Sequence, residues 1–314
     1  MGKTDARRIF FIILASSLIF CGFSGNRAEC AAASRDDAIR VISPAAGAVI
    51  ADWTALVKGE LNVPAGMEVG VTINGFVALV RRGKFATSLP LNFPTPTTNV
   101  SATVTDSLGT ILGTHSIPIT ATTPDAEAVL TFRPYPMLAT APQSVRFSMT
   151  SLKQVARVEL DLDGDGKIDW QGVTLEGQEF PLRDAGLYFP TIKVTDAEGK
   201  IYTENALVQV FDPKELDALL QAKWKAMKDA LRQNDIGRAV NYIVTKKRDG
   251  YRKIFESLTI PLSNIDQVLT DIKFVKLAGI EVEYEMLYTE NGVVLSGLVN
   301  FDLDMDGIWR ISFF

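Results

Sequence analysis

The spacing of apolar residues changes near residue 212 and divides the chain into two kinds of structure. Before this point apolar and polar residues alternate in short runs, for example at 100–105 and 155–162, and turn residues separate the runs. A period of two residues is typical of strands that bury one face. Asn74 and Gly75 stand between two such runs and favour a two-residue hairpin turn. The pattern therefore predicts short antiparallel strands up to about residue 211.

After residue 212 the apolar residues recur at steps of three and four. They are Leu216, Leu219, Leu220, Trp224, Met227 and Leu231. This spacing places them on one face of a helix of about five turns. Asp212 is suited to cap the first turn of this helix, and Pro213 follows it directly. Shorter helices are expected up to about residue 243, at 248–258 and at 261–269.

A second β pattern follows these helices. The expected strands are 280–286, 293–301 and 308–313. In the first strand Ile280 and the apolar residues at every second position after it point to one side, and three glutamates point to the other. We expect the glutamates to be solvated rather than to form a catalytic pair. The second strand is apolar on both faces, so we expect both of its faces to be covered.

The first 33 residues have the three parts of a secretory signal. The basic residues that open the segment are Lys3, Arg7 and Arg8. The apolar stretch 9–23 is shorter than the about 20 residues that a membrane span requires. Ala31 and Ala33 then form a suitable cleavage site. We expect an exported protein that is periplasmic, attached to the cell surface or secreted. The alternatives are an uncleaved N-terminal anchor and a lipoprotein attached through Cys21.

Charge and composition exclude several partners and reactions. The net charge is −5, and it becomes −7 once 1–33 are removed, because that segment carries four basic and two acidic residues. An acidic chain argues against nucleic acid as a partner, and no further segment is apolar enough to span a membrane. Both cysteines, Cys21 and Cys30, precede Ser34, and His115 is the single histidine. We therefore assign no catalytic and no cofactor-binding residue, and we expect His115 at a surface or strand edge.

One loop carries the residues of a candidate metal site. The site residues are Asp161, Asp163, Asp165, Lys167 through its carbonyl group, and Asp169. Carboxylate and carbonyl oxygens are the ligands that calcium prefers, and alternate positions in a tightly curled loop bring them together. The twelfth position is Gly172 instead of the glutamate of an EF-hand, so we expect a calcium turn between strands. A hairpin turn without metal is the alternative.

A second run of alternating aspartates precedes Gly307. It consists of Asp302, Asp304 and Asp306. The ninth position of this run is Arg310, which is a poor calcium ligand, so we expect a hairpin turn without metal.

Two segments of the β pattern resemble known extracellular modules. The segments 41–50, 71–80, 83–91 and 100–110 together resemble an immunoglobulin-like module of bacterial surface and secreted proteins. Such modules are usually spacers or interaction platforms, and the fold implies no chemistry. The following region resembles a PKD-type β-sandwich through Gly186, Tyr188, Thr195, Asp196 and Gly199. Its Asp-rich residues 160–166 replace the Trp-Asp-Phe-Gly-Asp-Gly segment of that family.

The C-terminal region resembles the NTF2-like (cystatin-like) α+β fold. The helix around Trp224 and the final strand, within DGIWRISFF at 306–314, carry this resemblance. It implies a conical pocket, which some members use as isomerases or dehydratases, and it would allow a dimer through the C-terminal sheet. Such enzymes need a positioned acid and base, and this region contains no histidine. We expect Trp224, Trp309, Tyr242 and Tyr251 to belong to the core, and the lining of a pocket is the alternative.

These observations predict a multidomain protein with two all-β immunoglobulin-like sandwiches followed by an α+β domain of helices and a curled antiparallel sheet. The expected boundaries are 1–33 for the signal peptide, 34–122 for the first sandwich, 123–212 for the PKD-like sandwich and 213–314 for the NTF2-like domain. We expect a non-enzymatic binding or scaffolding protein outside the cytoplasm, stiffened by calcium, with an unknown protein or cell-surface partner. The alternatives are a small-ligand carrier or enzyme that uses a C-terminal cavity, and an accessory module for carbohydrate or cell-surface attachment.

Overall fold

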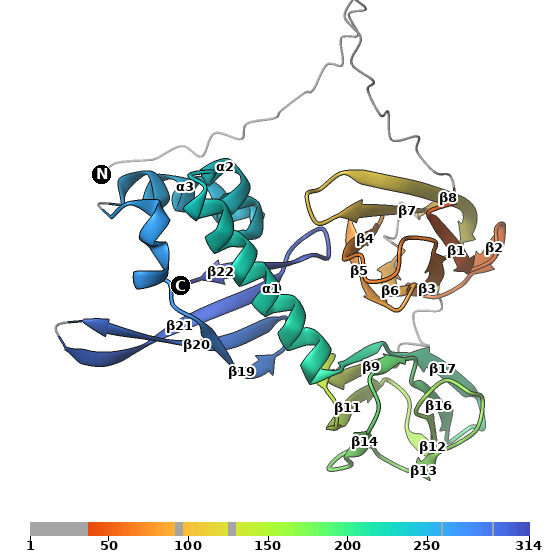
Figure 1. Cartoon of the computed structure of the whole chain (residues 1–314). Helices are drawn as coiled ribbons and strands as arrows, with labels where there is room; N and C mark the ends of the chain where they lie inside the picture. The colour runs from red at the N-terminus through yellow and green to blue at the C-terminus, as the bar shows by residue number, and fades with distance from the viewer. Residues whose placement is uncertain (1–36, 92–96, 125–129, 259, 291) are drawn as a thin grey trace, which may run out of the picture. The chain divides into compact units, whose positions relative to one another are not determined.

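The computed structural model describes residues 37–91, 97–124, 130–258, 260–290 and 292–314 (Figure 1). The signal segment predicted at 1–33 lies outside the described residues, so export stays a prediction. From Ser34 to Phe314 the chain forms one compact unit by its internal contacts. Most of this unit is β-sheet, and a helical segment followed by a further sheet completes it. Within the described ranges no helix combines the length and the apolar character needed to cross a membrane.

The first eight strands form one sheet around a core of their own. They are β1 (Ile39–Ser43), β2 (Ala48–Ile50), β3 (Thr54–Leu61), β4 (Val69–Ile73), β5 (Phe76–Arg81), β6 (Lys84–Pro90), β7 (Asn99–Asp106) and β8 (Ile111–Ala121). Their order is β1-β3-β6-β5-β4-β7-β8-β2, and only β2 and β8 pair in parallel. Alternating side chains such as Val57, Ile73 and Phe85 are buried in a single apolar cluster. The alternation of apolar and polar residues in the sequence therefore corresponds to a sheet that buries one of its two faces.

The hairpin turn predicted at Asn74 and Gly75 is confirmed. Ile73 of β4 lies opposite Phe76 of β5, which leaves two residues for the turn. Their φ angles are 49° and 85°, a region that glycine and asparagine adopt more readily than other residues. Asn74 Oδ1 also accepts a hydrogen bond from the backbone N–H of Ser101 at 2.8 Å. This bond anchors the turn to β7.

The next ten strands form three small sheets around a second core. They are β9 (Leu130–Tyr135), β10 (Leu138–Thr140), β11 (Gln143–Ser151), β12 (Val155–Asp161), β13 (Trp170–Gly172), β14 (Phe180–Leu182), β15 (Gly186–Tyr188), β16 (Thr191–Asp196), β17 (Ile201–Asn205) and β18 (Val208–Phe211). The sheet orders are β10-β18-β15, β14-β11-β9 and β13-β12-β16-β17. Phe132, Phe147 and Phe180 pack ring against ring inside this core. The Asp-rich loop connects β12 and β13 at the edge of the four-stranded sheet.

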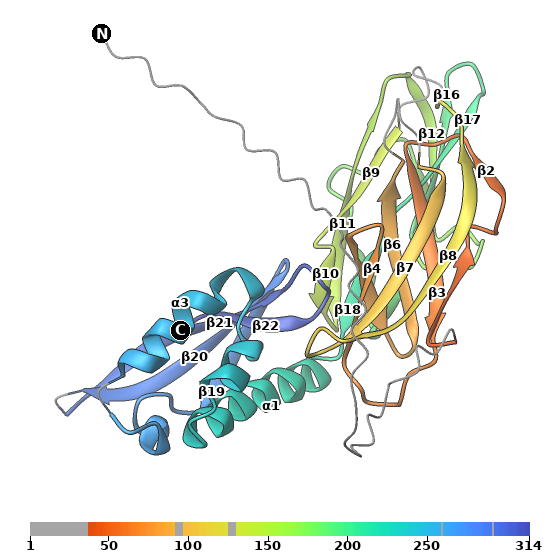
Figure 2. The same cartoon turned by 90° about the horizontal axis from the view of Figure 1, so that it is seen from above.

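Helices and a four-stranded antiparallel sheet form the C-terminal part. The helices are α1 (Pro213–Arg232), α2 (Ile236–Ala239) and α3 (Arg248–Ser257), with 3-10 turns at Val240–Tyr242, Thr245–Lys247 and Leu262–Gln267. The strands are β19 (Ile272–Ala278), β20 (Glu281–Glu290), β21 (Val293–Leu303) and β22 (Trp309–Phe313), in this order across the sheet. Figures 1 and 2 both show the helices on one face of the sheet. The order of helices before strands was expected from the change of period.

Helix α1 begins as predicted and is fixed to the sheet by polar side chains. Asp212 Oδ1 accepts the backbone N–H groups of Lys214 and Glu215 at 2.8 and 3.1 Å. This N-cap satisfies two donors that would otherwise lack a partner at the start of the helix. Farther along, the Tyr284 hydroxyl of β20 donates to Asp217 Oδ1 at 2.9 Å. The sheet is thus held to the helix by hydrogen bonds as well as by the apolar face of α1.

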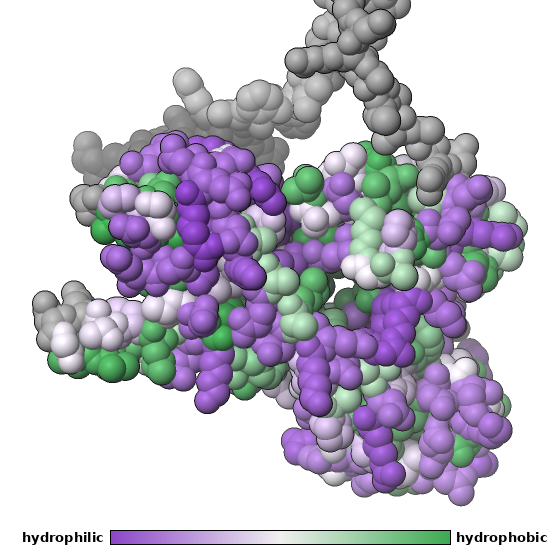
Figure 3. Space-filling view, in the orientation of Figure 1, coloured by the Kyte–Doolittle hydropathy of each residue, from purple (hydrophilic) through white to green (hydrophobic). Residues whose placement is uncertain are grey.

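Two sequence predictions about the C-terminal sheet are wrong. Ile280 does not point inward with the β20 residues, because it lies in the turn between β19 and β20 and is 54% exposed. The second face of β21 is not covered within the described residues, since Val294 and Leu298 are 65% and 46% exposed. No other described element packs there, because the helices take the opposite face. Figure 3 shows hydrophobic side chains along this helix-free side of the sheet.

Aromatic side chains fill the space between the helices and the sheet. Trp224 and Phe314 meet edge to face with ring centroids 5.3 Å apart, and Phe314 also lies 4.8 Å from the ring of Tyr251. Trp224 and Tyr251 are both buried in the apolar cluster of the C-terminal part, and so is Trp309. These residues therefore belong to the core, and the region around Trp224, Tyr251 and Phe314 is packed rather than hollow.

Candidate functional site

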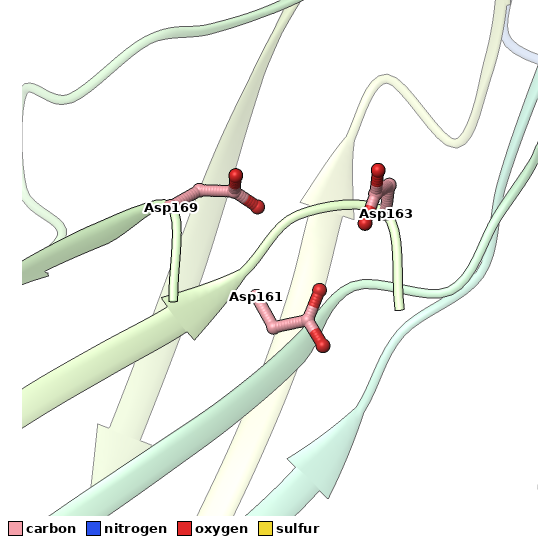
Figure 4. Close-up of side chains that lie close together, drawn as sticks. All are labelled: Asp161, Asp163 and Asp169. Atoms are coloured by element: carbon pink, nitrogen blue, oxygen red, sulfur yellow. The ribbon is translucent and has the colours of Figure 1, made fainter. Parts of the chain in front are cut away.

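The structure brings three of the five predicted site residues together. Asp161 ends β12, and Asp163 and Asp169 lie in the loop that leads to β13 (Figure 4). Each of the three offers a carboxylate oxygen, and these oxygens lie within 4.8 Å of one another. Asp161 is buried, whereas the other two side chains are exposed. The three carboxylates thus come together at the edge of the sheet, and those of Asp163 and Asp169 are open to solvent.

The buried Asp161 carboxylate shapes the loop. Its two oxygens accept the backbone N–H groups of Gly164 and Gly166 at 2.7 and 2.8 Å. Both glycines have positive φ angles, 80° and 89°, which side chains with a Cβ adopt rarely. The loop is therefore curled around one carboxylate, and glycine is required where it turns.

Asp169 closes the loop from the other end. Its Oδ2 accepts the backbone N–H of Leu162 at 2.7 Å. The Asp169 side chain is exposed to solvent. The arrangement leaves oxygen atoms of Asp163 and Asp169 directed at solvent near the curled backbone.

Asp165 and Lys167 are engaged with each other instead. The Lys167 ammonium donates to Asp165 Oδ2 at 2.5 Å, and the Lys167 backbone N–H donates to Asp165 Oδ1 at 2.8 Å. These hydrogen bonds lower the pKa of Asp165 below its usual value, and the same contact raises the pKa of Lys167. Asp165 is not part of the group of three whose oxygens meet. The spacing of the aspartates in the sequence did not reveal this pairing.

The geometry of the three carboxylates fits one hard cation. Calcium holds oxygen ligands at about 2.3–2.6 Å, so two ligands on opposite sides of the ion are about 5 Å apart. The spread of 4.8 Å in this cluster stays within that limit. Three carboxylates supply only part of the six to eight oxygens that calcium takes, and water would have to supply others. The same contacts also stabilise a metal-free turn, because each carboxylate already accepts a backbone N–H group.

The second aspartate run forms a hairpin turn around Arg310, as predicted. Arg310 Nη1 lies 2.8 Å from Asp304 Oδ2, and both of its terminal nitrogens bind the carboxylate of Asp306 at 2.7 Å. Thr245 donates its backbone N–H and its hydroxyl to Asp304 Oδ2 at 2.9 and 2.8 Å. Burial alone would raise the pKa of Asp304, but the hydrogen bonds from Thr245 and the charge of Arg310 lower it below its usual value. The guanidinium of Arg310 thus lies between the carboxylates of Asp304 and Asp306.

This hairpin also reaches the first sheet. Arg310 Nη2 lies 3.4 Å from the carbonyl oxygen of Ser107, and Lys223 of α1 pairs with Glu68 at 2.5 Å. A Cβ added to Gly70 of β4 would lie 1.9 Å from the carbonyl oxygen of Asp306. The two backbones approach each other so closely that only glycine fits at this position. No motif or spacing in the sequence predicted these contacts between distant residues.

The single histidine has a structural hydrogen bond. His115 lies in β8, and its Nδ1 accepts the backbone N–H of Val41 in β1 at 3.3 Å. The imidazole is half-buried and helps to hold β1 and β8 together.

Glu204 is an acid that the sequence did not single out. It is half-buried, and burial raises its pKa above the usual range. A cavity of about 30 Å³ lies beside it, lined also by Asp52 and Thr54. A volume of this size holds about one water molecule, so it offers no room for a substrate.

No protein-family model and no curated protein matches the chain. Solved structures with partial likeness are fibronectin-III-like and immunoglobulin-like domains. The fibronectin(III)-like modules of CbhA from Clostridium thermocellum match with 11% identity and a TM-score of 0.22, over 56% of this chain and 95% of theirs. A chimeric titin Z1Z2 matches with 15% identity and a TM-score of 0.20, over 56% of this chain and 98% of its own.

A third similar structure is SGBP-B of the mixed-linkage glucan utilization locus of Bacteroides ovatus, in complex with a mixed-linkage heptasaccharide. It has 15% identity and a TM-score of 0.18, over 56% of this chain and 48% of its own. Similarity at this level assigns neither a family nor a function to the chain.

Proposed function

We propose that the protein is a non-enzymatic binding or scaffolding protein outside the cytoplasm, and that calcium stiffens its Asp-rich loop. In this proposal the first sheet is an immunoglobulin-like sandwich, the second region is a PKD-like sandwich and the C-terminal part is an NTF2-like domain. The signal-like segment supports export, and the sequence motifs support the three modules.

The non-enzymatic proposal rests on one observation, namely that the buried charged side chains are paired with other groups of the protein. The buried charged residues of the described chain are Asp161, Asp196, Lys223, Lys228, Asp304 and Arg310. Each has a partner within the protein, either in its own turn or in another segment. A catalytic acid or base needs a reactive group that faces a substrate cleft, and such groups often have no saturating partner. These six buried charges are engaged in turns and interfaces of the protein itself, and Arg310 Nε is the one nitrogen of Arg310 without a partner.

The alternative of an enzyme in the C-terminal part has little support. The interior between α1 and the sheet is filled by Trp224, Tyr251 and Phe314, so substrate would have to displace the core. Tyr284 lies there as well, and burial raises the pKa of its hydroxyl, but this hydroxyl already donates to Asp217. A phenol that is protonated and engaged in this way acts as a structural donor.

The calcium proposal is supported by the spacing of the carboxylates and by the curled loop. Extracellular calcium sites have dissociation constants of about 10⁻⁴–10⁻³ M, and calcium outside cells is about 1 mM. Binding at these values stabilises the folded state by about 0.4–1.4 kcal/mol. For a unit of this size that corresponds to a rise of about 1–2 °C in the melting temperature. The site would stiffen one loop rather than hold the fold together.

The first experiment measures the melting temperature of the purified protein in 1 mM calcium and in EDTA. We expect calcium to raise it in the wild type and to have no effect on Asp163→Asn, which removes one of the three clustered carboxylates. Asp165→Asn is the matched control, because Asp165 is outside the cluster and pairs with Lys167. This control variant should keep the response to calcium. Equal melting temperatures of the wild type with calcium and with EDTA would show that the loop is a metal-free turn.

A further part of the proposal is a protein partner at the helix-free face of the C-terminal sheet. The exposed apolar residues on this face include Leu287, Val294 and Leu298. Exposed apolar residues that gather on one face often mark an interface. We propose a second copy of the chain as the partner, so that two sheets pack face to face.

A further inference from the structure

A groove of about 720 Å³ lies beside β5 and the start of α1. Its apolar wall includes Leu61, Val63, Phe211, Leu219 and Trp309. Sites for small molecules usually measure about 300–1,000 Å³ and combine an apolar lining with a few placed polar groups. The groove has the volume and the lining of such a site. It shares no residue with the Asp-rich loop, so it is independent of the calcium proposal.

Arg81 lines this groove and lacks partners for half of its guanidinium. The side chain is only 9% exposed, and its Nη1 lies 3.3 Å from Glu215 Oε2. Its Nε and Nη2 are buried without any hydrogen-bond acceptor. Buried donors without acceptors are rare in proteins, and they are costly when the group is charged. Arg310 also has a buried donor without an acceptor, but only its Nε is concerned, whereas Arg81 leaves both donors of one edge without a partner.

The two unpartnered nitrogens define the kind of ligand. Nε and Nη2 lie on the same edge of the planar guanidinium, and this edge receives both oxygens of a carboxylate in parallel hydrogen bonds. Both nitrogens are shielded from solvent as well. A carboxylate therefore reaches them after a rotation of the Arg81 side chain, whose contact to Glu215 is long at 3.3 Å.

Charged side chains of both signs surround this edge. Arg81 and Arg82 both pair with Glu215. Asp212 caps α1, and Glu68 pairs with Lys223 through Oε2, whereas its buried Oε1 has no hydrogen-bond partner. The lining therefore has no excess of positive charge, and the preference for a carboxylate rests on the unpartnered edge of Arg81.

We propose that the groove binds a small apolar carboxylic acid. Its carboxylate takes the Nε–Nη2 edge of Arg81, and its hydrocarbon part lies along Phe211, Leu219 and Trp309. The apolar lining explains why the ligand carries a hydrocarbon part. The two parallel donors on one edge of the Arg81 guanidinium explain why it carries a carboxylate.

The test compares octanoate, 1-octanol and acetate by isothermal titration calorimetry with the purified protein. We expect octanoate to bind at least about ten-fold more tightly than 1-octanol, because hydrogen bonds to a charged group give about ten- to a hundred-fold. Acetate lacks the hydrocarbon part and should bind at least about ten-fold more weakly than octanoate. Equal affinities for octanoate and 1-octanol, or no binding of octanoate, would overturn the proposal.

Variants then locate the site. Arg81→Met should lower the affinity for octanoate to that for 1-octanol, while Arg82→Met, which changes an exposed neighbour, should alter it less than about three-fold. Leu219→Trp fills the groove without changing a charge, so it should abolish binding of both octyl compounds. Circular dichroism checks that each variant is folded. If Arg81→Met does not fold, the ligand comparison and Leu219→Trp still decide the outcome. Preference for octanoate that survives in both folded variants would place the binding elsewhere and contradict the proposal.

Discussion

Arg310 occupies the ninth position of the second aspartate run, and its guanidinium binds the carboxylates of Asp304 and Asp306. In the first run the corresponding ninth position is Asp169, whose carboxylate lies with those of Asp161 and Asp163. The two loops share the same alternation of aspartates, and the residue at the ninth position decides which cation can neutralise them. An internal guanidinium serves one loop, and the other loop leaves its carboxylates open to a metal ion.

Asp304 provides a pH-dependent test of this internal pairing. The pKa of Asp304 is lowered in the folded state, so its ionised form stabilises the fold above the unfolded value of about 3.9. This stabilisation is lost as the pH falls through the folded value. Removing one partner from a buried ion pair costs about 3–5 kcal/mol. We expect Asp304→Asn to be less stable than the wild type by that amount at about pH 5.5, and by much less at about pH 2.5.

Urea denaturation at both pH values measures the effect, and Asp249→Asn is the control. Asp249 is exposed on α3, so this variant should follow the wild type at both pH values. A destabilisation by Asp304→Asn that is the same at both pH values would show that its charge contributes nothing.

Single residues also mark the limit of what the sequence could predict about the sites. The spacing of the aspartates located the loop, and it named the three carboxylates that meet. It could not show that Asp165 turns toward Lys167, because alternate spacing says nothing about side-chain direction. Arg81 and Arg82 stand next to each other in the sequence, yet one side chain is 9% exposed and the other 72%. This difference arises from elements more than a hundred residues away, such as the start of α1.

At the scale of elements, periodic patterns predicted the helices and strands where one face is buried. Helix α1 and the β4–β5 hairpin follow from local rules, namely an N-cap, a period of 3.6 and an Asn-Gly turn. The pattern failed where exposed residues are apolar. β21 is apolar on both faces, and the sequence therefore predicted two covered faces, although only the helix side is covered in the described residues.

The uncovered face of this sheet leads to a prediction about assembly. If two copies pack through it, sedimentation velocity should show a dimer at micromolar concentration, since burial of apolar area stabilises such an interface. Leu298→Lys places a charge at the centre of the face and should give a monomer with an unchanged melting curve at low concentration. Ile254→Lys is the control, because Ile254 is also about half exposed but lies on α3. A wild type that stays monomeric at all concentrations would exclude the second copy as the partner.

At the scale of the whole unit, glycines allow the C-terminal hairpin to approach the first sheet. Gly70 faces the carbonyl oxygen of Asp306, and Gly307, with φ of 81°, lies against the backbone of Val71. A side chain at either position would separate the two backbones. Together with the Glu68–Lys223 pair, this contact makes residues far apart in the chain behave as parts of one unit.

Gly70→Ala tests whether this contact contributes to stability. The added Cβ would lie 1.9 Å from a backbone oxygen, so the hairpin has to move. We expect a loss of about 1–3 kcal/mol in urea denaturation, as for other overpacked sites. Hydrogen exchange should also become faster in the β21–β22 hairpin. Gly250→Ala is the control, because no atom lies within 4 Å of its Cβ position. If Gly70→Ala has the same free energy of unfolding and the same hydrogen-exchange rates as the wild type, the close contact does not contribute to stability.

The contact between Arg310 and the carbonyl oxygen of Ser107 joins residues that are 203 positions apart in the chain. Each of the three apolar clusters is built largely from neighbouring stretches of sequence and can gather as soon as its own stretch is available. Contacts between distant residues form more slowly, because a long loop has to close first. The chain should therefore pass through a state in which the separate cores exist before the hairpin reaches Gly70. The contact between the hairpin and the first sheet is then the last to form during folding. Any change that delays it leaves the contacting surfaces exposed for longer.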